Sequence, residues 1–178
     1  MKCLSTFLIA ALFSGLCMTA AFGQNPPKPG PELQKISFFV GNWTSEGDMK
    51  PGPMGPGGKV TIQEEGKWMD GGFFIVFHST FKTLMGNGTG IALMGYDPQQ
   101  GSYTYDEFNS TGEANHFKGT VEGETWTWMS EMKMGPQTVK GRFTQKVLSP
   151  TSYSYKFELS SDGTTWNLIM DGKSTKNK

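Results

Sequence analysis

The stretch Phe38-Phe39-Val40-Gly41-Asn42-Trp43, "FFVGNW", separates two patterns of apolar residues. Before it, apolar residues recur at three- and four-residue spacing between positions 33 and 40, which predicts a short helix with Pro31 in its first turn. Gly41 is expected to end this helix, because glycine adopts the left-handed conformation of a helix C-cap at little cost. A first strand is then expected from Trp43 to Met49.

After this stretch, nine further segments of about ten residues alternate between apolar and polar side chains or are rich in strand-forming residues. Clusters such as Asp70-Gly71-Gly72 and Asp162-Gly163 stand between them and predict tight turns. Alternation with period two gives each strand one buried face and one wet face. The segments are 59–68, 72–81, 89–97, 102–110, 114–123, 125–134, 137–147, 151–160 and 165–173.

About ten strands joined by short turns would leave two raw edges if the sheet stayed open. Closure removes both edges, whereas a two-sheet sandwich usually needs longer Greek-key connections. We therefore predict an all-β fold: an up-and-down antiparallel β-barrel of about ten strands with a short N-terminal capping helix. The sandwich remains the alternative.

The first 23 residues have the features of a secretory signal peptide: Lys2, an apolar run from Leu4 to Met18, and small residues at Ala21 and Gly23. We expect a proline-rich arm at 24–31, a single barrel domain at 32–178, and export to the periplasm or the medium. Both cysteines lie in the signal, so the mature chain must fold without disulfides. A lipid anchor at Cys17 stays open, although Leu16 occupies a position where a small residue is usual.

The charge composition of the chain limits which kinds of partner it can bind. Without Lys2 the chain has 15 basic and 16 acidic residues, and Arg142 is its only arginine. Nucleic-acid binding favours an arginine-rich positive face, so we exclude that class. We expect no membrane span after signal cleavage, and a monomer or weak dimer.

Gly-x-Trp at the junction of a helix and the first barrel strand resembles the entrance of calycin and lipocalin barrels. A closer resemblance, to an exported bacterial domain of unknown function (number 1579), covers nearly all of the mature chain. It implies a calycin-like barrel with no agreed activity. It is carried by "PGPELQKISFFVGNWTSEGDMKPGPMGPGGKV" (29–60), "GGFFIVFHS" (71–79), "MGYDP" (94–98), "KGTVEGETWTW" (118–128), "SEMKMG" (130–135) and "SPTSYSYKFELSSDGTTW" (149–166).

Alternation predicts which residues line the interior. A ten-stranded barrel is wide enough for a cavity, although a solid core is an equal alternative. Two carboxylates, Glu64 and Glu107, lie in phase with apolar neighbours and mark a polar spot, a pair with Arg142, or the rim. The loop 49–58 is a lid candidate through Met49 and Met54. The aromatic candidates are Phe77, Trp126, Trp128, Tyr153 and Tyr155, and the same face is expected to include Trp166, Leu168 and Met170.

No catalytic signature is present, and the sequence favours a binding protein for a small apolar or amphipathic ligand. A haem-binding or cofactor-dependent enzyme is one alternative; the related nitrobindins hold haem through a histidine late in the barrel. The last strand here has none, so His78 or His116 would have to serve, and both are expected to point outward. We expect no metal site and no resident cofactor. The other alternative is a solid-core protein that acts through its surface.

Overall fold

The computed structural model describes residues 28–178. The predicted signal peptide, the Cys17 anchor and the start of the proline-rich arm lie outside the described residues. The elements are α1 (Pro31–Ile36), a 3₁₀ turn (Ser37–Phe39), β1 (Gly41–Met49), β2 (Gly58–Trp68), β3 (Phe74–Thr83), β4 (Gly86–Asp97), β5 (Ser102–Asn109), β6 (Ala114–Glu122), β7 (Thr125–Met134), β8 (Gln137–Ser149), β9 (Ser152–Ser160) and β10 (Asn167–Lys176).

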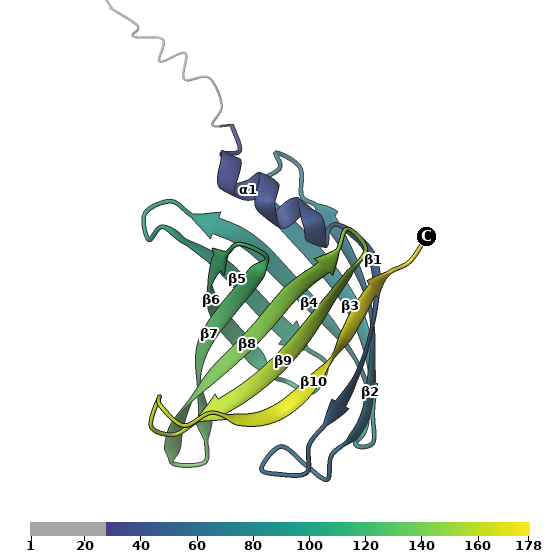
Figure 1. Cartoon of the computed structure of the whole chain (residues 1–178), viewed down its shortest axis with the longest axis vertical. Coiled ribbons are helices and arrows are strands. Elements are labelled where there is room, and N and C mark those ends of the chain that lie inside the picture. The colour runs from purple at the N-terminus through teal and green to yellow at the C-terminus, as the bar shows by residue number, and fades with distance from the viewer. Residues whose placement is uncertain (1–27) are drawn as a thin grey trace, which may run out of the picture.

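The ten strands form one closed antiparallel barrel in which each strand pairs with its neighbours in sequence (Figure 1). β10 returns to pair with β1, from Trp43 opposite Lys176 to Met49 opposite Met170. This pairing leaves no free edge among the described strands, which confirms the predicted fold class.

The helix end of the barrel is closed by α1 and the 3₁₀ turn, which lie across one mouth (Figure 1). Leu33 and Ile36 are buried against the interior, and Trp43 is 1% exposed beneath them. The indole Nε1 of Trp43 donates a hydrogen bond of 3.0 Å to the carbonyl oxygen of Phe39. The opening stretch of the sequence therefore forms a plug, in which the one polar side-chain atom of Trp43 is hydrogen-bonded.

Gly41 has a different role from the predicted helix cap. The helix ends at Ile36, a 3₁₀ turn follows, and Gly41 is the first residue of β1. Its φ of +118° is strained for any residue with a side chain. The glycine thus turns the chain from the plug into the barrel wall, which a pattern of apolar spacing does not distinguish from a C-cap.

Inside the barrel, large aromatic rings lie over glycines of adjacent strands. A Cβ on Gly119 would overlap the Trp128 ring, and one on Gly88 would overlap Phe81. Cross-strand neighbours on one face are close enough that a large side chain needs a small one beside it. The interior glycines therefore position the rings.

The opposite end carries the β1–β2 loop, residues 50–57, far from α1 (Figure 1). Met54 of this loop packs with Met132 and Met134 against a second apolar cluster formed by Val139, Leu159 and Ile169. The predicted lid loop therefore contacts the inner lining at the end away from the helix, and Met49 ends β1 beside it.

Two residues expected on the inner face lie elsewhere. The pairing of β9 with β10 shifts between Leu168 and Met170, and this irregularity changes the phase of the strand. Leu168 is 40% exposed, and Trp166 packs beneath the Arg142 guanidinium, 4.1 Å from its ring centre. Met170 keeps its expected place opposite Phe157.

We expect Trp43→Ala to lower the free energy of unfolding by about 3–5 kcal/mol, because it leaves a cavity under the plug. Urea denaturation at neutral pH measures the change. Trp166→Ala, which removes a tryptophan from the outside of the barrel, is the control and should cost much less. A loss below about 1 kcal/mol for Trp43→Ala would contradict the plug.

We also expect Gly119→Ala to destabilise the barrel by about 1–3 kcal/mol, because the new methyl group would displace the Trp128 ring. Thr120→Ala, on the outer face of the same strand, should change stability little. Thermal unfolding of the two variants compares them directly, and equal midpoints would show that the glycine is not required for ring packing.

Candidate functional site in the barrel interior

An almost continuous aromatic wall lines the helix-side half of the interior. The rings of Trp126 and Trp128 stack with centres 5.9 Å apart, and Tyr105 lies 5.7 Å from Trp128. Phe77 continues the wall from Tyr105 at 6.0 Å. Strand alternation brings these side chains together, because each occupies an inward position.

Some polar side chains of this wall are hydrogen-bonded to other side chains of the protein. Trp128 Nε1 donates a hydrogen bond of 2.9 Å to Oε1 of Gln145, and the hydroxyls of Ser45 and Ser174 lie 2.7 Å apart across the β1–β10 pair. The Tyr153 hydroxyl interacts with both serines and with Gln145, while burial and the charge of Glu64 raise its pKa. This belt of paired groups belongs to the structure of the wall.

Glu64 and Glu107 are different, because neither carboxyl has a hydrogen-bond or ion-pair partner among residues 28–178. Burial raises the pKa of Glu64 to about 7, and the charge of Glu107 adds to this effect. Burial also raises the pKa of Glu107, followed by the influence of Glu113 in the β5–β6 turn. Both side chains keep part of their surface accessible, but a carboxylate that is largely removed from water is costly to ionise without a partner, so ionising both groups is unfavourable.

Small side chains separate the two glutamates on the inner wall. In the register of the sheet, Glu64 is opposite Ser79, Ser79 is opposite Gly90, and Ala92 is opposite Glu107. Apart from Ser79 and backbone, little lies within contact distance of a Cβ built on Gly90. The wall is therefore low at Ser79 and Gly90, which are half-buried, whereas Ala92 beside Glu107 is covered by the aromatic core.

Several inward side chains keep part of their surface accessible, although the strands are hydrogen-bonded all round. Because an inward side chain of a closed barrel cannot reach the outer surface, this accessible surface borders space inside the barrel or at its mouth. The lining is thus accessible from inside the barrel or from its mouth. The residues are Ile62, Glu64, Phe81, Glu107, Asn115, Phe117, Phe143 and Phe157.

Ser130 was not singled out by the sequence analysis, yet its hydroxyl is a buried polar atom without a partner among the described residues. The residue is 8% exposed and inward-facing on β7, between Trp128 and Met132. Tyr155 likewise has an unpartnered hydroxyl, wedged against Gly47 and Gly172. The alternation that identified Trp126 and Trp128 also includes Ser130, so the signal was present in the sequence.

The structure places eight of the sequence-predicted residues on the strands of the inner wall or at its far mouth, and two others elsewhere. Arg142 lies on the outer face, where its Nε donates a hydrogen bond of 2.9 Å to Glu158, so it does not neutralise Glu64 or Glu107. Met54 lies in the β1–β2 loop, from which it packs with Met132 and Met134 at the far mouth. The eight are Met49, Glu64, Phe77, Glu107, Trp126, Trp128, Tyr153 and Tyr155.

Neither histidine faces the interior. His78 is exposed on the outer face of β3, and the Nδ1 of His116 lies 2.7 Å from an oxygen of Asp106 on the outside. A haem held in the barrel would therefore find no histidine ligand in the described residues. Within residues 28–178 there is also no group of three or more histidine, cysteine or carboxylate side chains with the geometry for a metal ion.

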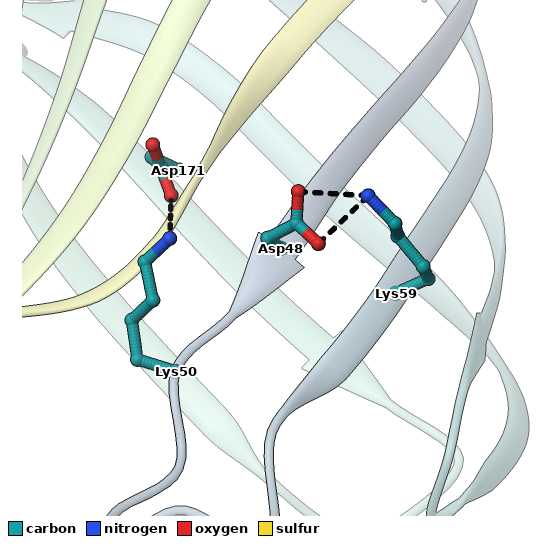
Figure 2. Close-up of polar contacts among 4 residues, drawn as sticks. All are labelled: Asp48, Lys50, Lys59 and Asp171. Atoms are coloured by element: carbon teal, nitrogen blue, oxygen red, sulfur yellow. Dashed lines mark hydrogen bonds and ion pairs between the residues drawn. The ribbon is translucent and has the colours of Figure 1, made fainter.

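Two hollows border the strands among the described residues. The larger, of about 780 Å³, follows β1 to β5 and is lined both by outward residues such as His78 and Ile91 and by the inward residues Trp43, Glu64 and Ser79. A smaller one of about 400 Å³ lies beside β1, β2 and β10. Figure 2 shows its ion pairs, Lys59 with Asp48 at 2.9 Å and Lys50 with Asp171 at 2.6 Å. Such exposed pairs contribute little to stability.

Comparison with solved structures finds 18 similar chains. A crystal structure of Rv2717c from M. tuberculosis superposes with a TM-score of 0.59 and 11% identity, covering 85% of this chain and 100% of the other. The S-type phycobiliprotein lyase CPES from Guillardia theta gives a TM-score of 0.49 and 9% identity, with 82% and 92% covered. At 11% identity, the first likeness concerns the fold alone.

No curated protein matches the sequence. None of the helices between residues 28 and 178 is long and apolar enough to cross a bilayer. The family model described as "protein of unknown function (DUF1579)" matches residues 28–176, most of the chain, and this protein therefore belongs to that family.

Proposed function

We propose that this protein is an exported binding protein that holds a small apolar or amphipathic molecule inside the barrel. The observation that carries the proposal is that inward aromatic side chains and two unpartnered inward carboxyls keep part of their surface accessible. Small-molecule sites combine apolar walls with a few well-placed polar groups. The features of the first 23 residues support export.

The ligand's path follows from how the two ends are built. At the helix end, Trp43, Leu33 and Ile36 are buried and close the mouth. At the other end the β1–β2 loop packs through flexible methionine side chains, which adapt to irregular contacts at low cost. Entry past this loop therefore disturbs fewer rigid contacts than entry past the plug.

The alternatives have less support from this geometry. An enzyme built on haem would need an interior ligand, and both histidines are outside. A solid core acting only through its surface would leave Glu64 and Glu107 without partners for no gain, since burying unpaired carboxyls costs free energy.

An environment-sensitive naphthalene dye is expected to bind with micromolar affinity, about −8 kcal/mol, and its fluorescence titration measures this. Ser79→Leu, which fills the low wall between the carboxyls, should weaken binding about tenfold or more. Thr80→Leu, the next residue and on the outer face, is the matched control. Trp128→Ala should also weaken binding by removing part of the wall. Equal affinity in Ser79→Leu and Thr80→Leu would place the dye outside the barrel.

The buried carboxyl also predicts a dependence of stability on pH. The pKa of Glu64 is raised to about 7 in the folded protein, against about 4.3 for an unfolded glutamate. Between these values the folded state holds a proton that the unfolded chain releases, so the free energy of unfolding falls as pH rises from about 4.5 to 7.

Glu64→Gln should remove this part of the decline and make the protein more stable by about 1–3 kcal/mol at pH 8, with little difference at pH 4.5. Urea titrations at the two pH values measure it, with the outer-face Glu65→Gln as control. A Glu64→Gln variant that is no more stable than wild type at pH 8 would contradict the assignment of a strained buried carboxyl.

A further inference from the structure

The ligand's head group is constrained by what the interior offers it. When ionised, Glu64 and Glu107 are acceptors only, and neither receives a donor from residues 28–178. Only a group that donates hydrogen bonds or carries positive charge can satisfy them. An anionic head group in the same place would add a third negative charge to an already repulsive pair.

The protein supplies no cation of its own to this spot. Among the described strand residues, the inward positions carry a single basic side chain, Lys176. Its Nζ donates a hydrogen bond of 3.1 Å to the carbonyl oxygen of Phe38 and lies 4.9 Å from the centre of the Trp43 ring, so it serves the plug at the helix end. Arg142, the other basic candidate, is paired with Glu158 outside.

Other polar atoms accompany the carboxyls. Burial raises the pKa of the Tyr105 phenol well above its usual value, and the charges of Glu64 and then Glu107 add to the shift. Tyr105 is inward on β5, two residues before Glu107. Tyr105 is paired with Phe117. Ser130 follows Met129, which is opposite Lys118, and this register puts Ser130 level with Phe117.

The Ser130 hydroxyl has no hydrogen-bond partner within residues 28–178, and the residue is more than nine-tenths buried. It can accept a hydrogen bond as well as donate one, and the Tyr105 hydroxyl has the same two capacities. The inner wall from β2 to β7 therefore presents two carboxyls and two hydroxyls to a ligand, among aromatic and methionine side chains. An ammonium group has three donors and no acceptor, which suits such a set.

We propose that the barrel binds amphiphiles with a primary ammonium head group, which sits between Glu64 and Glu107 with the apolar tail against the aromatic wall. This inference rests on the proposed function, because it assigns the head group of the ligand held in the barrel. Charge-assisted hydrogen bonds are among the strongest polar contacts in proteins, so the preference is measurable. The aromatic rings of the same inner wall, such as Tyr105 with Trp128 at 5.7 Å from it, further favour a cation.

The experiment compares three compounds of equal chain length at pH 8: dodecylamine and dodecanoate below their micelle concentrations, and dodecanol below its solubility limit. Isothermal titration measures their affinities for the mature chain. The amine is expected to bind about tenfold or more tightly than dodecanoate, with dodecanol between them. Equal affinity for amine and dodecanoate, or a preference for dodecanoate, overturns the head-group inference and leaves the binding function standing. Binding of none of the three overturns both.

Variants locate the head group. Glu64→Gln and Glu107→Gln keep the shape of the side chain while removing the charge, and each should reduce amine affinity about tenfold or more while changing dodecanol affinity little. Glu65→Gln, on the outer face of the same strand, should leave all three affinities unchanged. An amine preference that survives both Glu64→Gln and Glu107→Gln would place the head group elsewhere and overturn the assignment.

Discussion

The pairing of β1 with β10 is the contact on which the rest of the molecule depends. It joins segments more than a hundred residues apart in sequence and converts a ten-stranded meander into a closed wall. Once the wall is closed, alternation leaves each strand residue only two environments, the interior or the outer surface. On the inside the seam is marked by the hydrogen-bonded hydroxyls of Ser45 and Ser174, and on the outside by the ion pair of Lys50 and Asp171.

Closure with ten strands also sets the problem of filling the interior. A barrel of eight strands is just filled by side chains, and a wider one needs larger residues or retains space. This chain does both. Its helix-side half is packed with tryptophan and tyrosine rings fitted over glycines, whereas the region around Ser79, Gly90 and Ala92 has small residues and accessible carboxyls nearby. The space is therefore a consequence of local side-chain choice, within a size that the strand number imposes.

The fold could be predicted from the sequence because strand alternation and tight turns are visible in short segments of sequence. Barrel closure then follows from the number of strands and the short connections between them. The inward orientation of Glu64, Glu107 and Trp128 followed from the same alternation. The position of Trp166 did not, since a change of phase in β10 depends on its pairing with β9 and leaves no mark in the apolar pattern. The outward position of Arg142 could have been predicted, because it alternates with the inward Phe143. Its positive charge instead made it a candidate partner for the glutamates.

Two kinds of polar group in the interior point to different roles. Gln145 and the seam serines are satisfied by neighbouring side chains, so they stabilise the wall and need nothing from outside. Glu64, Glu107 and Ser130 receive no such partner, and their burial works against folding.

Apolar residues of similar size at these positions would give a more stable barrel, because removing an unpaired buried polar group is often stabilising. Retaining these polar groups lowers the stability of the barrel. The apolar burial in the aromatic wall and under the Trp43 plug offsets that loss. The cost is recovered when a donor enters the interior, because binding then replaces the missing hydrogen bonds and neutralises the repulsion between the two carboxyls.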